Sequence, residues 1–305
     1  MECSMALMAA TQRYRVSHET IYIYSTIVTS GHHFAHLSPR GTDYQKVISH
    51  SLDIEPHPTE TSNIIDYYGN NSVRFLITWQ HEKLVVTANS VIDVTEKIFP
   101  ASQLSVPWET ALNTSLYTVE PNEVAEMRLA SAHVECLPQT REYAELFFTP
   151  GRPWLEAVLD LTRHIREEFA YDTEATTIST PVAEVFLKKR GVCQDFTHLM
   201  LSCLRSLKLP ARYVSGYILN EPPPGVEKLI GSDASHAWIE TWLPGAGWIG
   251  FDPTNGKIAN IEFIIVAWGR DFMDVTPLRG VVLGGGDHKL EVRVTVARID
   301  SSAVK

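Results

Sequence analysis

The feature that most constrains the fold of this 305-residue chain is a helix that begins at Cys193 and ends before Pro210. Apolar residues recur in it at steps of three and four, the spacing of a helix with one buried face. They are Phe196, Leu199, Met200, Cys203, Leu204 and Leu207. A shorter helix is predicted before it, with Thr180-Pro181 at its start and Gly191 after its last turn. Cys193 therefore stands in a tight junction between two helices.

This position makes Cys193 a candidate nucleophile. Backbone N–H groups at a helix start have no partners inside the helix, and the helix dipole is positive there. Both effects favour the thiolate, which is the reactive form of cysteine. The alternative is a small, buried apolar cysteine, which is the commoner role of a single cysteine.

A predicted hairpin downstream supplies a histidine and a carboxylate. The runs Ser235–Trp242 and Trp248–Pro253 have the character of strands and are joined by a glycine-rich turn. If Trp242 pairs with Trp248, His236 and Asp252 are diagonal neighbours on one face. Their Cα atoms are then about 7–8 Å apart, which is within reach of the two side chains. A slip of one residue would send them to opposite faces. A cysteine, a histidine and an aspartate can act as nucleophile, base and orienting group, whereas His236 alone would be a partly buried strand histidine.

Four segments in this order resemble the core of the bacterial transglutaminase-like superfamily. They are Gly191–Phe196, Pro210–Tyr217, His236–Glu240 and Trp248–Thr254. The resemblance implies a papain-like α+β core, in which the helix carrying Cys193 packs on an antiparallel sheet carrying His236 and Asp252. It also implies acyl transfer from an amide through a thioester, with water or an amine as the second substrate.

The resemblance also implies an oxyanion donor upstream of the cysteine, and Tyr171 is the position that looks similar. The backbone N–H of Cys193 is the other donor expected, since developing negative charge needs preorganised donors. The alternative is a tyrosine that caps the core beside Phe169. The sequence departs from two related groups of enzymes. Position 187 is Leu187, where papain-type proteases carry a glutamine six residues before the cysteine. The chain also lacks the acidic loop typical of calcium sites, which calcium-dependent animal transglutaminases carry. No metal or cofactor is therefore expected.

The N-terminal region has a different character, with short β-rich runs separated by turn signals. Examples are Thr20–Tyr24, Val73–Trp79 and Leu84–Ile92, with Gly69-Asn70-Asn71 as a predicted turn. An antiparallel sandwich or barrel-like domain is predicted, and it resembles the β region that often precedes the core in bacterial members. The predicted fold is thus α+β, with an N-terminal β-rich domain over residues 1–120 and a transglutaminase-like catalytic domain over residues 121–305.

Composition limits the partners and the compartment. A net charge of -10 without a basic run argues against nucleic acid and anionic membranes. Four cysteines without a metal-type spacing fit a reducing compartment. The short apolar run near the N-terminus, Met5–Ala10, is too brief for a secretory signal, so the cytoplasm is the expected location. The expected partner is a peptide or protein amide substrate, and the oligomeric state is left open.

Two further segments carry weaker signals. The histidines His32, His33 and His36 are expected to lie in a solvated turn rather than to bind a metal, because one short loop rarely supplies three ligands. The proline-rich loop over residues 220–231 either shapes substrate access or is a plain surface excursion.

The function predicted from these observations is a thiol-dependent acyl-transfer enzyme that acts hydrolytically, as a cysteine protease or amidase. An amine-accepting transglutaminase or ligase is one alternative, and a catalytically silent peptide-binding module is another. The sequence favours an enzyme because all three triad residue types are present at Cys193, His236 and Asp252.

Overall fold

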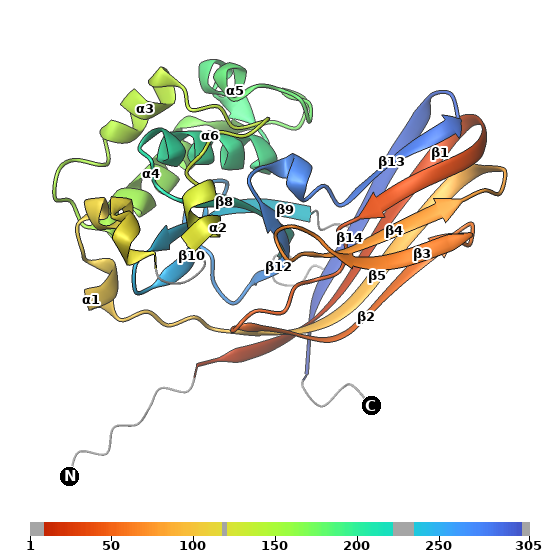
Figure 1. Ribbon diagram of the computed structural model, residues 1–305, viewed down its shortest axis with the longest axis horizontal. Coiled ribbons are helices and arrows are strands. Elements are labelled where there is room, and N and C mark those ends of the chain that lie inside the picture. Colours follow the sequence, from red (N-terminus) through yellow and green to blue (C-terminus); the bar gives the residue numbers. More distant parts are fainter. Residues whose placement is uncertain (1–8, 118–120, 222–234, 301–305) are drawn as a thin grey trace, which may run out of the picture.

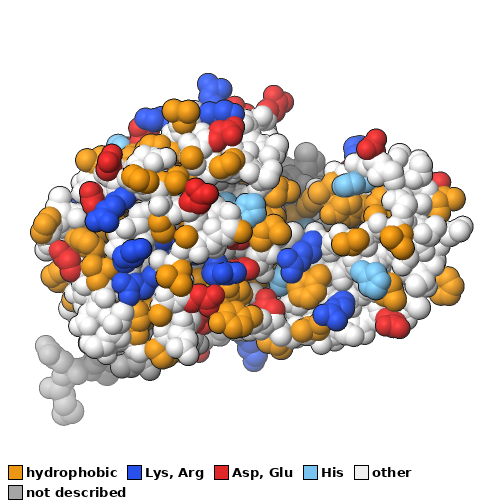
Figure 2. Space-filling model, turned by 45° about the horizontal axis from the view of Figure 1, so that its top comes forward, with side chains coloured by type: hydrophobic (Ala, Val, Ile, Leu, Met, Phe, Trp, Pro, Cys, Tyr) orange, Lys and Arg blue, Asp and Glu red, His pale blue; other side chains and the backbone are white. Residues whose placement is uncertain are grey.

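A computed structural model of the chain describes residues 9–117, 121–221 and 235–300. Helices gather in one lobe, and long strands extend away from them in the other (Figure 1). No helix among the described residues is long and apolar enough to cross a membrane. On the face shown in Figure 2, basic and acidic side chains are interspersed.

The N-terminal sheet is organised around β1 (Thr11–Ala35), whose 25 residues serve two groups of strands. Its first half pairs with β5 (His81–Thr95) and β14 (His288–Ile299), and β2 (Gln45–Glu55) pairs with β5. Its second half pairs with β4 (Asn71–Ile77) and β13 (Leu278–Gly284), and β3 (Glu60–Ile65) pairs with β4. The β1–β5 register shifts between Ile23 and Val28, where β1 passes from one group to the other.

The pairing of β13 and β14 differs from the expected division of the chain. Residues 121–305 were expected to form the catalytic domain, but the strand predicted at Leu290–Ile299 lies in β14 and pairs with β1. The C-terminal strands thus belong to the N-terminal sheet, because β1 offers them its free edge. The predicted turn at Gly69-Asn70-Asn71 is confirmed: Gly69 has φ 73° and the Asp66 carboxylate accepts the N–H of Asn70.

The expectation of a solvated turn at the three histidines is wrong. His32 and His33 lie within β1, and both His33 and His36 are buried. The ring of His33 stacks on Phe75, and Nε2 of His36 lies 3.1 Å from a carboxylate oxygen of Asp66. Among the described residues, no group of three or more histidine, cysteine or acidic side chains could hold a metal ion.

The core sheet has the strand order β11-β10-β9-β8-β12. Its strands are β8 (Ala211–Ile218), β9 (Ser235–Leu243), β10 (Gly247–Asp252), β11 (Lys257–Ile258) and β12 (Phe263–Gly269). Short helices and turns lead into this core: α1 (Ala101–Leu104), η1 (Trp108–Leu112), η2 (Thr114–Leu116), α2 (Pro121–Glu126) and α3 (Pro138–Glu145). They are followed by α4 (Trp154–Glu168), α5 (Val182–Lys188) and α6 (Cys193–Ser206), with the strand pair β6 (Ala170–Tyr171) and β7 (Arg190–Gly191), and later by η3 (Phe272–Asp274).

The central helix α6 packs against β8 and β9 and is buried on all sides from Asp195 to Ser206. The sequence showed only its apolar stripe, because polar residues also lie on its buried faces. Arg205 is one of them, and its guanidinium donates to the carbonyl oxygens of Ala211 and Arg270. Such pairing removes most of the cost of burying a charge.

The opposite face of the core sheet packs against the N-terminal region. Trp238 and Phe263 contact each other there, and Tyr44 packs against their cluster. The Gln45 side chain donates to the carbonyl of Ile265 and accepts from its N–H, at 2.7 and 2.8 Å. The two sheets are therefore joined by apolar packing and by hydrogen bonds.

Candidate active site

Cys193 is the first residue of α6, and the extended residue Val192 precedes it as the N-cap. The side chain of Cys193 is partly exposed and lines a cavity of about 380 Å³, together with Tyr171 and His236. The first N–H groups of a helix have no partners inside the helix, so Cys193 stands at the electropositive end of α6. The nucleophile candidate is thus accessible to a substrate, whereas Cys203, deeper in the same helix, is fully buried.

Asp195 fixes the start of this helix. Its carboxylate accepts hydrogen bonds from the N–H of Val192 at 2.8 Å and from the hydroxyl of Thr176 at 2.6 Å. Burial raises the pKa of Asp195, although these two hydrogen bonds act to lower it. A carboxylate in the first turn that reaches back to the N-cap N–H is a common device for setting where a helix begins.

Gly191 has a different role from the one expected. Lys189, with φ 51°, takes the left-handed conformation that ends α5, whereas Gly191 lies in the strand β7. A Cβ at Gly191 would lie 2.6 Å from a carboxylate oxygen of Asp195, closer than a Cβ atom approaches its neighbours in proteins. Glycine is therefore needed here for space beside Asp195, not for a helix end.

The hairpin of β9 and β10 has the predicted register. Trp242 pairs with Trp248, and Phe251 pairs with Ile239. One residue further along this register, Asp252 lies diagonally opposite His236, on the same face of the hairpin. Nε2 of His236 is 2.8 Å from a carboxylate oxygen of Asp252. The expectation that the two side chains meet is confirmed.

Asp252 is fully buried and surrounded by hydrogen-bond donors. One carboxylate oxygen accepts from the N–H groups of Thr254 and Asn255, at 2.9 and 3.2 Å. The other accepts from the Asn255 side chain at 2.6 Å and from His236. These bonds and the nearby imidazole lower the pKa of Asp252 although burial acts to raise it, so the carboxylate stays charged and its orientation is fixed.

His236 connects this carboxylate to the thiol. Burial acts to lower the pKa of His236, but hydrogen bonds to Asp252 and Cys193, together with their charges, outweigh it and raise the pKa to about 10. Because Nε2 is engaged by Asp252, Nδ1 is the ring nitrogen left for Cys193. The ring also stacks on Trp238, with 6.1 Å between centroids, which limits its rotation. The arrangement favours an imidazolium next to the sulfur.

Tyr171 lies in β6, which pairs in parallel with β7 directly before Cys193. Its ring is 54% exposed and makes an edge contact with Phe196. Burial of its inner part and the charges of Cys193 and Asp195 raise the pKa of Tyr171, which keeps the hydroxyl protonated. Tyr171 thus both lines the cavity that contains Cys193 and contacts the buried ring of Phe196, and its role as an oxyanion donor stays a prediction.

Asn255 and Asp195 were not identified from the sequence, although both had a local signal. Asn255 follows Asp252-Pro253-Thr254, and an aspartate before such a run often accepts backbone N–H groups two and three residues ahead. Asp195 stands at the third helical position, where carboxylates often cap. The loop expected over residues 220–231 lies mostly outside the described residues, although Asn220 lines the cavity.

Comparison with known proteins agrees with this architecture. Residues 141–253 match the family model of the transglutaminase-like superfamily, and residues 14–93 match that of the bacterial transglutaminase-like N-terminal region. An uncharacterized protein of Mycobacterium tuberculosis is 39% identical over 97% of this chain and 96% of its own length. A protein-glutamine gamma-glutamyltransferase of Pseudomonas aeruginosa is 33% identical over 38% of this chain and 18% of its own length.

A solved structure gives the same result for the fold. The crystal structure of a candidate cysteine protease from Cytophaga hutchinsonii superimposes with a TM-score of 0.76 at 20% identity, over 98% of this chain and 94% of that one. The two family models, which match residues 14–93 and 141–253, agree on one assignment. The chain belongs to the transglutaminase-like superfamily.

Proposed function

We propose that this protein is a thiol-dependent acyl-transfer enzyme that acts on peptide or side-chain amides, with water as the usual acyl acceptor. The observation that supports it best is the 2.8 Å hydrogen bond between His236 and Asp252, with His236 and Cys193 lining the same cavity. A nucleophile next to a base, with the base oriented by a third group, is the arrangement of acyl-transfer enzymes.

The first half of the proposed reaction forms a thioester. The thiolate of Cys193 attacks the amide carbonyl carbon, and negative charge develops on the carbonyl oxygen. The N–H of Cys193 and the hydroxyl of Tyr171 are the proposed donors to that oxygen. The imidazolium of His236 then gives its proton to the leaving nitrogen as the C–N bond breaks.

The second half releases the acyl group. A water molecule gives a proton to His236 while its oxygen bonds to the thioester carbon, and the C–S bond breaks. The products are a carboxylic acid and the starting pair of thiolate and imidazolium. Asp252 keeps the ring oriented in both halves because its carboxylate is held by four donors.

Water is the favoured acceptor because the cavity is accessible to solvent and partly polar. Tyr171 at its rim is more than half exposed, and Ser235, Asn255 and Lys257 are among the lining residues. An amine acceptor is the second candidate, supported by the partial similarity to the glutamyltransferase of P. aeruginosa. A silent binding module is the third.

One experiment separates the three. Dimethylated casein, whose lysines cannot act as acceptors, is incubated in ¹⁸O-water with dansylcadaverine and either the wild-type protein or Cys193→Ala. Hydrolysis places ¹⁸O in new carboxyl groups, whereas an amine-accepting enzyme attaches the dansyl group instead. Equal products from both proteins would remove the enzyme proposal for this substrate class. Mass spectrometry of acyl groups trapped on Cys193 from a lysate then identifies the natural donor.

A further inference from the structure

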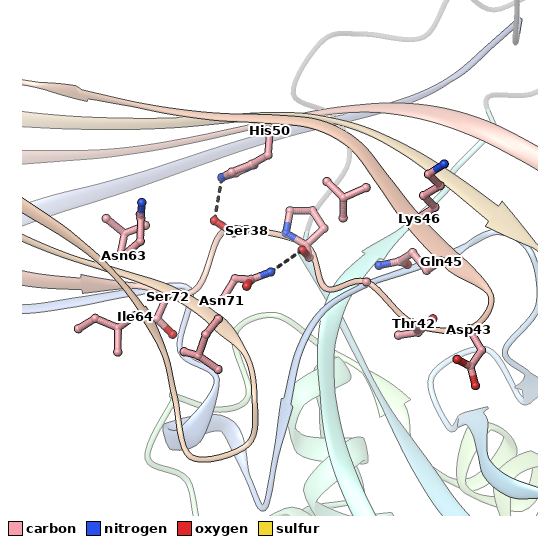
Figure 3. A pocket seen from close by; sticks show the side chains of 15 residues that line it. Ser38, Thr42, Asp43, Gln45, Lys46, His50, Asn63, Ile64, Asn71 and Ser72 are labelled. Atoms are coloured by element: carbon pink, nitrogen blue, oxygen red, sulfur yellow. Dashed lines mark hydrogen bonds between the residues drawn. The ribbon is translucent and has the colours of Figure 1, made fainter.

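The N-terminal sheet contains a groove between its two outermost strands. β2 stands at one end of the strand order and β3 at the other. Two cavities of about 950 and 640 Å³ lie between them and share the lining residues Ser38, His50, Asn63 and Val73. Figure 3 shows His50, whose ring is hydrogen-bonded to Ser38, on one side of this space and Asn63 of β3 on the other. Because the cavities adjoin, they form one groove along both strands.

The lining shows that the strands present their edges, not their faces, to this groove. Consecutive residues of β2, from Ser51 to Glu55, all line it, as do Asn63, Ile64 and Ile65 of β3. Side chains of a strand alternate between two faces, so one face could contribute only every second residue. An unbroken run therefore means that the backbone edge itself borders the space.

The hydrogen-bond pattern of β3 identifies which backbone groups point outward. The N–H of Asp66 donates to the carbonyl of Asn70 at 3.0 Å, in the register that pairs β3 with β4. Paired and unpaired residues alternate along an antiparallel strand. Thr61, Asn63 and Ile65 consequently direct their N–H and C=O groups away from β4, and all three line the groove.

Neither outer edge has a strand partner among the residues that the structure describes. Proteins commonly protect such edges with lysine, proline or a bulge. β2 has Lys46 and a register shift between Val47 and Ser49. The sequence of β3, Glu-Thr-Ser-Asn-Ile-Ile, has neither lysine nor proline, so its edge is open to another strand.

We propose that this groove binds an extended polypeptide segment, which adds as a new strand to the outer edge of β3. Six residues of β3 span about 20 Å of alternating donors and acceptors. This alternation of donors and acceptors is complementary to the backbone of another extended chain, and the edge is longer than most small molecules. The lining mixes uncharged side chains such as Asn63 and Ser72 with charged ones of both signs such as Lys46 and Asp53. Because no single side-chain chemistry dominates, recognition of the segment depends mainly on its backbone. The inference does not depend on the chemistry at Cys193.

The test uses the full-length Cys193→Ala protein, so that no turnover occurs. The probe is a fluorescein-labelled ten-residue peptide of alternating threonine and valine with one lysine and one glutamate at its ends. Its counterpart is N-methylated at the six central residues and cannot form strand hydrogen bonds. Fluorescence anisotropy should show saturable binding of the first peptide and at least tenfold weaker binding of the second, the result of losing several backbone bonds.

A matched pair of variants locates the site. Asn63→Pro removes one outward N–H without disturbing the pairing with β4, and we expect it to weaken binding about tenfold. Asn63→Ala keeps the N–H and should bind within about twofold of the parent. Equal binding of both peptides, absence of binding, or equal losses in both variants would overturn the proposal. Sedimentation that shows dimers abolished by Asn63→Pro would also overturn it, because the groove would then accept a second copy of the chain.

Discussion

The replacement Asp252→Asn tests the proposed site most directly, because Asp252 accepts from four donors. Two of them, His236 Nε2 and the Asn255 side chain, share one oxygen, and two backbone N–H groups share the other. An amide has only one acceptor oxygen, so either orientation turns its NH₂ toward two donors. Each buried donor that loses its acceptor costs about 1–3 kcal/mol of stability.

The lowest-cost rearrangement has a specific effect on catalysis. If the new NH₂ faces His236, a neutral ring can accept that hydrogen bond at Nε2 and carry its proton on Nδ1. The nitrogen that faces Cys193 then cannot take up a proton. In a serine triad the corresponding change lowers kcat by about 10⁴-fold. We expect kcat to fall by a similar factor here and to remain measurable. His236→Ala removes the base itself and should abolish most activity.

The assay combines turnover with alkylation of Cys193 by iodoacetamide, measured from pH 5 to pH 11. In the wild type, the pKa of His236 is raised to about 10, so the imidazolium and its stabilising contribution are fully present below pH 6.5 and are lost as pH rises through about 10. In Asp252→Asn the pKa of His236 should fall, and this loss should occur at lower pH. Wild-type kinetics in Asp252→Asn would refute the reasoning.

A control distinguishes catalysis from folding. Asp271 is also a buried carboxylate and accepts the N–H groups of His133 and Met273, but it does not line the cavity. Asp271→Asn should lower the melting temperature, by about 2–4 °C for each kcal/mol lost, while leaving the pH profile of alkylation unchanged.

Three further predictions concern the same site. Iodoacetamide at pH 6 should label Cys193 ahead of the other cysteines, since Cys193 lines the cavity beside His236 and Cys203 is fully buried, and equal labelling would contradict Cys193 as the nucleophile. Tyr171→Phe should lower kcat/KM by about 10²–10³-fold at nearly constant melting temperature, whereas a lower melting temperature with normal kinetics would make the hydroxyl structural. Gly191→Ala should displace the Asp195 carboxylate and lower the free energy of unfolding by about 0.5–2 kcal/mol, which is the loss expected for one helix cap. Thermal denaturation identical to wild type would show that the carboxylate can move aside without losing its capping role.

The parts of the fold predicted from sequence are those encoded by local periodicity. The helix α6 followed from its apolar spacing, with Pro210 marking its end, and the pairing of Trp242 with Trp248 followed from a short turn. Such signals depend on neighbours a few residues apart. The placement of His236 beside Asp252 was therefore predictable, because a hairpin register fixes which residues share a face.

Long-range partners could not be predicted in this way. The strand at Leu290–Ile299 was expected, but its partner β1 lies at the other end of the chain. Arg212 and Glu240 form a buried ion pair at 2.7 Å, with the guanidinium between the rings of Trp248 and Trp268. Strand periodicity predicts apolar residues at such positions, and only the folded arrangement supplies the partners that make buried charges tolerable.

The N-terminal sheet helps to position the catalytic histidine that we propose, although it contributes no residue to the triad. His236 stacks on Trp238, and Trp238 makes an edge contact with Phe263 at 5.2 Å. Tyr44 covers this cluster from the N-terminal region, and its hydroxyl donates to Glu240. Removing the N-terminal sheet would expose the rings that support His236 from behind. The two sheets thus form a single structural unit around the site, since β13 and β14 return from the core to pair with β1.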